Sequence, residues 1–368
     1  MHLDSIKLLQ FKNYEQAVLQ FSPQINAFVG QNGMGKTNLL DAIYYLCMGK
    51  SYFNLSDQFI SQHETSFFRL DGTFVLSGEK TQGLVIKVEP KKRKELLLNK
   101  RKYERLADHV GVFPVVIVVP DDTKLIREGS EERRKFLDNT LSQLDAAYLA
   151  SLLNYNQILK QRNALLKQLQ GRSTPEDLLL VYDRQLAAPA QYIHQQRQQF
   201  ITNFTPPFQA AHQAICGGQE SVQLTYRSTL FNGDFLELLQ AARQKDSILE
   251  RTTMGIHKDD LVFKLGKHPL KRLGSQGQLK SFVLALKLAQ YRFLEAEKNV
   301  PPILLLDDIF DKLDPRRVTQ LITYLLREKF GQIFLTDTDQ ERIENVMKTL
   351  EVTPVLYRIE EGEATRAK

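Results

Sequence analysis

The segment GQNGMGKT, at residues 30–37, combines glycines with a lysine and a threonine in the pattern G-x-x-x-x-G-K-[ST]. It lies between an expected strand and an expected helix, which is the context that a phosphate-binding loop requires. The glycines let backbone N–H groups turn toward phosphate oxygens, the Lys36 ammonium reaches the terminal phosphates, and the Thr37 hydroxyl is a ligand for Mg²⁺. The candidate nucleotide-binding residues are Gly30, Gln31, Asn32, Gly33, Met34, Gly35, Lys36, Thr37 and Asn38.

Two aspartates, Asp307 and Asp308, follow the apolar run ILLL at 303–306. A phosphate-binding loop that hydrolyses ATP also needs an acidic residue on the Mg²⁺ side and a group that orients the attacking water. We expect the apolar strand to carry Asp307 to the carboxyl edge of a sheet as the metal-side residue, with Asp308 as the general base. The alternative is that both aspartates only cap a core strand. A further acidic pair, Asp259 and Asp260, has no ligand spacing beside it and is interpreted as structural.

The segment RLGSQGQLKSF, at 272–282, is a second polar, glycine-bearing helix start. Ser275, Gly277 and Gln278 offer a hydroxyl, backbone N–H groups and a helix N-terminus, all of which suit a phosphate. One nucleotide does not need two such helix starts in the same subunit. We therefore expect this segment to close the γ-phosphate side of the site in another copy of the chain, with Lys36, Asp308 and Ser275 as the catalytic set. The alternative is an ordinary helix N-cap at Ser275.

Positive charge gathers in one part of the chain. The net charge is +6 and the sequence pI is near 9.0, which favours a polyanionic partner. Nine of the basic residues lie between Lys87 and Arg105, against three glutamates. A solvated hairpin without a ligand is the alternative reading of this tract. The candidate contacts are Lys91, Lys92, Arg93, Lys94, Lys100, Arg101 and Lys102. A second candidate is the run Arg133, Arg134 and Lys135, for which ion pairing with Glu131 and Glu132 on a helix surface is the favoured reading.

The elements that position these residues are of the α/β class at both ends of the chain and helical in the middle. Strand-like segments dominate up to residue 119, and apolar residues at helical spacing predict a long helix over 139–170 with a returning helix after it. We expect a split ATPase head over 1–118 and 255–368, with an inserted helical domain and its short hairpin over 119–254. The sequence shows no apolar run long enough for a membrane span, no signal peptide, and only two cysteines, so we expect a cytoplasmic protein.

Taken together in chain order, the phosphate loop, SQGQ, LLLDD and DKLD (311–314) resemble the ATP-binding-cassette ATPases of the SMC type. The segments FKNY (11–14), VVPDDTKLIREGSEERRKFLDNTLSQLD, GIHKDDLVF and SQGQLKS are similar more narrowly to the RecF family of bacterial recombination mediators. The resemblance covers residues 3 to about 340. It implies an SMC-like head with an inserted α-helical domain, in which 275–278 is the signature motif and 311–314 the D-loop at a dimer interface.

The resemblance also implies an activity and partners. ATP and Mg²⁺ would drive homodimerisation on double-stranded DNA near gap junctions, and slow hydrolysis would release the dimer. The family acts in single-strand gap repair and replication-fork maintenance, with RecR and RecO, in helping RecA load, and is linked to the SOS response. Lys12 and Asn13 either contact the nucleotide or form a plain edge-strand turn, and Asp121 or Asp122 is the candidate nucleotide sensor at the lobe boundary.

Two departures from transporter cassettes indicate a slow timer. Asp308 is shorter than the usual catalytic glutamate, and LTDTD (335–339) lacks the histidine that transporters place there. Other functions stay open at this point: a different SMC-like head that bridges or processes DNA, or a transporter-coupled cassette subunit. No helix-turn-helix, zinc finger or RNA-recognition signature is present, so we expect contacts with DNA phosphates rather than with bases.

Overall fold

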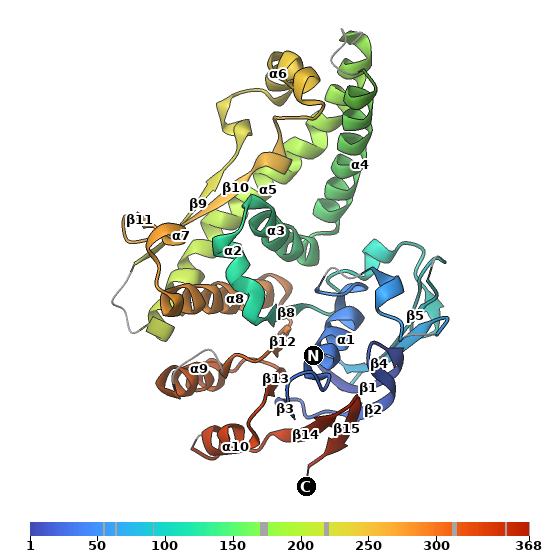
Figure 1. Ribbon diagram of the computed structural model, residues 1–368, viewed down its shortest axis with the longest axis vertical. Coiled ribbons are helices and arrows are strands. Elements are labelled where there is room, and N and C mark those ends of the chain that lie inside the picture. Colours follow the sequence, from blue (N-terminus) through green and yellow to red (C-terminus); the bar gives the residue numbers. More distant parts are fainter. Residues whose placement is uncertain are drawn as a thin grey trace. The chain divides into compact units, whose positions relative to one another are not determined.

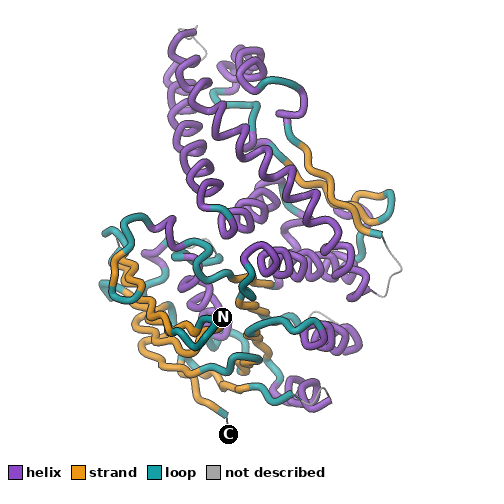
Figure 2. The backbone as a smooth tube through the Cα atoms, turned by 180° about the vertical axis from the view of Figure 1, so that it is seen from behind, coloured by secondary structure: helices purple, strands orange, loops and turns teal. Residues whose placement is uncertain are grey.

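The computed structural model of the chain describes residues 1–53, 56–62, 65–90, 92–169, 176–216, 221–310, 315–349 and 352–367. By packing, the chain forms two compact units. The first unit comprises Met1–Asp122 with Lys280–Lys368, and the second comprises Thr123–Leu279. Strands are concentrated in the first unit, whereas helices make up most of the second (Figure 2).

A mainly parallel sheet lies at the centre of the first unit, with the strand order β15-β14-β3-β13-β12-β8. Its inner strands are short and almost completely apolar because both faces of the sheet are covered. All described residues of β3, β8, β12 and β13 are buried. The strands are β3 (Ile25–Val29), β8 (Val115–Val118), β12 (Ile303–Leu306), β13 (Ile333–Asp337), β14 (Val355–Glu360) and β15 (Glu363–Arg366).

An antiparallel sheet of order β2-β1-β4-β5-β6-β7 forms a second layer. Buried and more accessible residues alternate along β4, as expected for a sheet with one face on the core. Helix α1 packs between this sheet and the parallel one, because the same buried cluster contains side chains of α1 and of both sheets. The elements are β1 (His2–Phe11), β2 (Tyr14–Gln20), α1 (Lys36–Met48), β4 (Phe68–Val75), β5 (Thr81–Val88), β6 (Glu95–Leu98) and β7 (Arg101–Lys102).

The other face of the parallel sheet is covered by helices from the C-terminal part of the chain (Figure 1). These are α8 (Gln276–Lys298), α9 (Pro315–Arg327) and α10 (Gln340–Thr349), of which α8 from residue 280 onward belongs to the first unit. Short 3-10 turns complete this unit: η1 (Asp57–Phe59), η2 (Leu106–His109) and η3 (Pro120–Thr123), the last ending just across the boundary. The parallel sheet with helices on both sides is the layered α/β arrangement expected from the sequence.

The second unit packs helices against a three-stranded antiparallel sheet of order β11-β10-β9. The expected single helix over 139–170 is wrong, because α3 ends at Leu144 and α4 begins at Ala146. Asp145 between them is extended, and its carboxylate accepts hydrogen bonds from the Ala147 N–H (2.8 Å) and from Tyr192 (2.5 Å). The elements are α2 (Lys124–Arg127), α3 (Ser130–Leu144), α4 (Ala146–Leu169), α5 (Glu176–Cys216), β9 (Val222–Arg227), η4 (Thr229–Asn232), α6 (Phe235–Leu249), η5 (Ile256–Lys258), β10 (Asp260–Leu265), β11 (His268–Pro269) and α7 (Leu270–Leu273).

Buried ion pairs hold the helices of the second unit together. Arg162 of α4 is fully buried and donates to Asp183 of α5 (2.8 Å) and to Asp246 of α6 (2.7 Å). Its Nη1 also donates to the hydroxyl of Thr252 (2.8 Å). Since removing one partner would leave a buried charge unpaired, this contact strongly links the three helices.

The boundaries of the units differ from the domains expected from the sequence. The chain leaves the first unit after residue 122 rather than 118, and it returns at 280 rather than 255. Residues 255–279 pack with the second unit because β10 is paired with β9 along its whole length. No helix in the described ranges of the chain is both long and apolar enough to cross a membrane.

Candidate nucleotide-binding site

The loop between β3 and α1 is shaped by its glycines. Gly30, Gly33 and Gly35 have φ angles of 156°, 84° and 112°, in a region that residues with a side chain rarely adopt. A Cβ atom at Gly35 would lie 2.4 Å from Nδ2 of Asn13, and one at Gly30 would lie 2.2 Å from the carbonyl oxygen of Ile359. The motif therefore requires glycine at these two positions for conformation and for close packing.

Lys36 begins α1, and its side chain folds back over the loop. Its Nζ donates to the carbonyl oxygens of Gly30 (2.8 Å) and Gln31 (3.0 Å), and the residue is only 4% exposed. The ammonium group and the first N–H groups of α1 together make a positive pole suited to phosphate. The neighbouring loop residues Gln31, Asn32 and Gly33 are exposed, whereas Met34 and Asn38 are half-buried.

Thr37 and Asp307 meet across the edge of the parallel sheet. The Thr37 hydroxyl lies 2.9 Å and 3.0 Å from the two carboxylate oxygens of Asp307. Strand β12 pairs with β13, and β13 pairs with β3, all in parallel, so the carboxyl ends of these strands reach the same edge. Mg²⁺ prefers oxygen ligands and usually binds through one or two carboxylates together with phosphate oxygens. A hydroxyl and a carboxylate in contact therefore fit the expected metal side of the site.

The environment of Asp307 also suits a cation. The residue is 4% exposed, and burial raises its pKa to about 6. This value includes hydrogen bonds from the Thr336 and Thr37 hydroxyls, which lower the pKa, and the charge of Asp308, which raises it. A nearby positive charge stabilises a carboxylate that burial has made costly to ionise.

Asp308 takes a left-handed backbone conformation, with φ of 43°. Its N–H donates to Oγ1 of Thr336 (2.8 Å), and the same oxygen donates to Oδ1 of Asp307 (2.9 Å). Thr336 lies on β13, the parallel neighbour of β12. Thr336 was not predicted as a site residue; the signal in the sequence was its place near the carboxyl end of an apolar strand.

The LTDTD segment, which lacks the histidine of transporter cassettes, contains an aspartate that forms an ion pair. Asp337 accepts hydrogen bonds from the Arg342 guanidinium, with Nε at 2.9 Å, and from the N–H of Asp339 (2.8 Å). Its carbonyl oxygen accepts from the N–H of Gly30 (3.3 Å). The carboxyl end of β13 is thereby connected to the first glycine of the phosphate loop.

Asn13 braces the phosphate loop from the β1–β2 turn. Its Nδ2 donates to the carbonyl oxygen of Met34 (3.0 Å), and its Oδ1 accepts from the Asn38 side chain (2.7 Å). Lys12 instead pairs with the buried carboxylate of Asp41 (2.7 Å) in α1. The sequence left open whether Lys12 and Asn13 contact the nucleotide or form a plain edge-strand turn. The structure shows a further role, because both side chains hold α1 and the phosphate loop in place.

Ser275 forms a reciprocal cap at the start of α8. Its hydroxyl accepts from the N–H of Gln278 (3.2 Å), and its own N–H donates to Oε1 of Gln278 (2.7 Å). This is the pattern of a capping box. Ser275 is exposed, while Gly277 and Gln278 are half-buried. The capping role is therefore present, and the expected second role toward a nucleotide stays a prediction.

Comparisons with known proteins extend over the whole chain. The family model described as "RecF/RecN/SMC N terminal domain" matches residues 2–360. The "DNA replication and repair protein RecF" of Flavobacterium johnsoniae is 46% identical over 361 residues, covering 98% of this chain and 100% of that protein. Its counterpart in Phocaeicola vulgatus is 42% identical over 369 residues, covering 100% and 99%.

The chain belongs to the RecF family of SMC-like ABC ATPases. A solved structure described as the "recombination mediator protein RecF-ATP in RecFOR pathway" matches with a TM-score of 0.89 at 27% identity, covering 100% of this chain and 98% of that one. An SMC head bound to the C-terminal winged-helix domain of ScpA matches with a TM-score of 0.58 at 18% identity, which shows a shared fold.

For two segments expected from the family resemblance, the D-loop and VVPDD, the structure does not test the expected role. The D-loop, residues 311–314, lies outside the described residues. Asp122 of the VVPDD segment is buried, where it accepts hydrogen bonds from Tyr52 and from the N–H of Val119 (2.8 Å) and pairs with Lys287 (3.3 Å). Asp122 is therefore tied into the first unit, and the role of nucleotide sensor stays untested for Asp121 and Asp122.

The basic tract of this RecF-family chain is an antiparallel hairpin with much of its charge paired. Lys92 contacts Glu89 and Lys102 pairs with Glu95 (2.8 Å). Lys94 is 3.0 Å from Asp57, and Arg93 donates to the Glu104 carbonyl. Lys100, in the turn after β6, and Arg101, the first residue of β7, are instead exposed, and neither forms an ion pair within the described part of the chain. Lys91 lies outside the described residues.

The second basic run is used for internal contacts. Lys135 pairs with Glu131 (3.0 Å) and Glu132 (2.7 Å), which is the ion pairing on a helix surface that the sequence favoured. Arg133 differs from that reading, because it pairs with Asp260 (2.6 Å). Arg134 differs too, since its Nη1 donates to Ser130 and to the carbonyl oxygen of Asp259 (2.8 Å).

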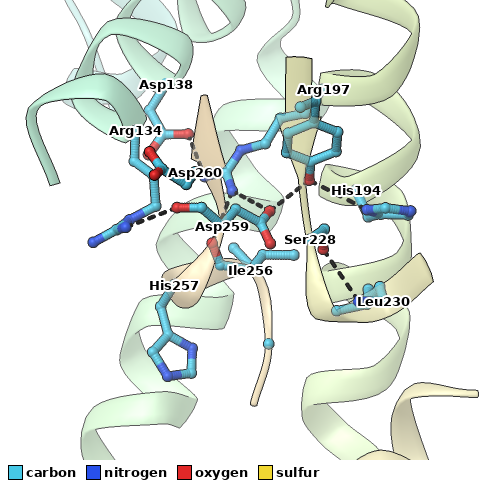
Figure 3. A network of polar contacts seen from close by, with 12 residues as sticks. Arg134, Asp138, His194, Arg197, Ser228, Leu230, Ile256, His257, Asp259 and Asp260 are labelled. Carbon is cyan, nitrogen blue, oxygen red and sulfur yellow. Dashed lines mark hydrogen bonds and ion pairs between the residues drawn. The ribbon is translucent and has the colours of Figure 1, made fainter. Parts of the chain in front are cut away.

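Asp259, the first residue of the GIHKDD acidic pair, is part of a buried network in the second unit (Figure 3). Its Oδ2 lies 2.7 Å from Nη1 of Arg197 and accepts from Tyr226 (2.5 Å). Arg197 is 1% exposed and also pairs with Asp138 (2.8 Å). Since Asp260 pairs with Arg133, both aspartates have structural partners, as the sequence indicated.

Proposed function

We propose that this chain is an ATP-dependent, DNA-binding recombination mediator that acts in single-strand gap repair and replication-fork maintenance. Its relatives carry the name "DNA replication and repair protein RecF", and the related solved structure is described with ATP. Two copies dimerise on double-stranded DNA when ATP binds, and slow hydrolysis releases them. The sites used are those of the first unit together with the signature segment.

The contact between Thr37 and both carboxylate oxygens of Asp307 carries the ATPase part of the proposal. The Lys36 ammonium and the N-terminus of α1 bind the phosphates, in exchange for the loop carbonyls that Lys36 now contacts. Mg²⁺ held on Thr37 and Asp307 neutralises phosphate charge when it is bound. Asp308 orients the attacking water and accepts its proton.

Dimerisation is assigned to the signature segment. Ser275 is exposed at the start of α8, which leaves its hydroxyl and the helix N-terminus accessible to the γ-phosphate of a nucleotide bound by another copy. Gly277 and Gln278 complete this contact. A shared nucleotide of this kind makes pairing depend on ATP, and makes hydrolysis a release step.

The DNA contacts are with phosphates. Among the basic-tract residues, Lys100 and Arg101 are the best placed, since they are exposed at a turn and their charges are not neutralised by recorded partners among the described residues. Lys92, Arg93, Lys94 and Lys102 contribute less because each has a contact within the hairpin or its surroundings.

The partners follow from the RecFOR pathway named for the related structure. We propose that the DNA-bound dimer recruits RecR, with RecO, and helps RecA load at the boundary of single- and double-stranded DNA, in a cytoplasmic process linked to the SOS response. A transporter-coupled role is disfavoured by the full-length similarity to RecF proteins.

Asp308→Asn tests the release step. Phosphate release at saturating ATP and Mg²⁺ should fall by about 100-fold or more, because a general base typically contributes that much. The lifetime of the DNA-bound dimer should lengthen correspondingly. Lys36→Met, which prevents ATP binding, is the control that gives no dimer. An unchanged rate of phosphate release in Asp308→Asn would show that Asp308 is not the base.

A further inference from the structure

The hydroxyl of Thr336 connects the two aspartates of the hydrolysis site. It is 1% exposed, and its oxygen accepts the backbone N–H of Asp308 at 2.8 Å. The same oxygen lies 2.9 Å from Oδ1 of Asp307, to which it donates, and 3.5 Å from Oδ1 of Asp308. A threonine hydroxyl has one donor and two acceptor positions, so one side chain can make these contacts together.

The backbone of Asp308 needs such a contact. Its φ of 43° lies in the left-handed region, which costs a residue with a side chain about 1 kcal/mol or more. Asp308 is the second residue after the buried strand β12, and its backbone conformation decides where its carboxylate points. The Thr336 oxygen is the partner recorded for its N–H, and it sits on the adjacent strand β13.

We propose that Thr336 is a positioning residue for hydrolysis: its hydroxyl holds Asp308 in the conformation from which the carboxylate accepts the proton of the attacking water. This inference rests on the proposed role of Asp308 and adds to it the group that orients the base. The rigid parallel pairing of β12 with β13 fixes Thr336 relative to the acidic pair. In this role Thr336 acts through Asp308.

Two substitutions in the full-length chain separate the hydroxyl from the shape of the side chain. Thr336→Val keeps the shape and removes the hydroxyl, whereas Thr336→Ser keeps the hydroxyl. Thr336→Val should lower the turnover number for phosphate release about 10- to 100-fold, the usual effect of losing a group that orients an active-site residue, and leave ATP affinity unchanged. Thr336→Ser should restore most of the rate. Thr336→Ala, with less bulk, serves if Thr336→Val does not fold.

If Thr336 acted through Asp307 instead of Asp308, the turnover of the Thr336→Val variant would depend differently on the Mg²⁺ concentration. Because the hydroxyl also contacts Asp307, turnover is measured over a range of Mg²⁺ concentrations. Recovery of the Thr336→Val rate at high Mg²⁺ would mean that the hydroxyl supports the metal side, and would overturn the positioning of Asp308. A rate that stays low at saturating Mg²⁺ supports it.

The double variant Thr336→Val/Asp308→Asn completes a double-mutant cycle with the two single variants. If Thr336 acts through Asp308, Thr336→Val should cause no further loss once Asp308 is replaced, since residues that act as a unit are not additive. A loss of turnover in the double variant equal to the product of the two single losses would overturn the inference. If Asp308→Asn lowers turnover while Thr336→Val does not, only the positioning role fails. If Asp308→Asn itself has no effect, the base assigned in the proposed function fails, and the positioning role with it.

Discussion

At the scale of single residues, the nucleotide site depends on side chains that hold the loop as much as on those that face the ligand. Asn13 contacts the Met34 carbonyl and Asn38, and it occupies the space that a side chain at Gly35 would need. The motif letters predicted Lys36, Thr37 and Asp307. They gave no indication that an asparagine 21 residues before Met34 supports the loop, because that contact depends on how the β1–β2 turn packs.

Asn13→Ala should weaken ATP binding about 10-fold. The substitution leaves the Met34 carbonyl and the Asn38 amide without their partner, and an unsatisfied group that is removed from water costs about 1–3 kcal/mol. Titration of ATP into the purified protein measures the affinity. Asn13→Asp is the matched control: it retains an acceptor for Asn38 and loses the donor to Met34, so an intermediate affinity is expected. Equal affinities for all three proteins would contradict the bracing role.

At the scale of elements, the carboxyl ends of β3, β12 and β13 bring together residues from three distant parts of the chain. Apolar runs followed by acidic residues predicted this edge, because parallel strands with both faces covered read as continuous apolar segments. The second unit was less predictable. Asp145 breaks the expected helix by capping α4, and Arg162 and Arg197 are buried by partners that sequence spacing does not reveal.

The turn η5 provides an acid-sensitive contact in the second unit. His257 contacts the Tyr155 hydroxyl of α4 (2.7 Å) and the Thr252 carbonyl (3.0 Å). Burial, together with the nearby charges of Lys258, Arg134 and Arg162, lowers the pKa of His257 to about 4, although the hydrogen bond with the Thr252 carbonyl acts in the opposite direction. The neutral ring is therefore favoured in the folded chain.

The free energy of unfolding should fall as the pH decreases from about 6.5 to 4, because in this range the unfolded chain binds a proton at His257 that the folded chain does not. The contribution of this residue is at most about 3 kcal/mol. Urea unfolding at a series of pH values, with the wild type and His257→Gln compared, isolates it. The variant should lose less stability than the wild type between pH 6.5 and 4; parallel curves would contradict the buried neutral histidine.

At the scale of the whole molecule, the family follows from motifs spread over the chain, and full-length similarity to RecF proteins confirms it. The boundaries of the units could not be read from composition, since 255–279 have the same strand and helix character as the head, yet their strand β10 pairs with β9. Nor could the sequence tell which cations of the basic tract are neutralised by neighbours, because Lys102 pairs with Glu95 across the β6–β7 hairpin and Lys94 pairs with Asp57 outside it.

The combined variant Lys100→Ala/Arg101→Ala should weaken binding to duplex DNA with ATP present. If both residues contact phosphates, the slope of log affinity against log salt concentration should decrease by about 2. Lys92→Ala is the matched control, since Lys92 already pairs with Glu89 and its loss should change the slope little. Binding is measured by fluorescence anisotropy at several salt concentrations. The same slope in the double variant and the wild type would place the DNA contacts elsewhere.

The central claim is that ATP joins two copies through Ser275, and sedimentation with and without ATP tests it most directly. The wild type should change from monomer to dimer with ATP, and Lys36→Met should stay a monomer. Ser275→Arg should bind ATP with nearly unchanged affinity yet remain a monomer, because the larger side chain blocks the shared site. If Ser275→Arg forms the dimer as the wild type does, Ser275 is only the cap of α8, and the account of a nucleotide shared between two copies is wrong.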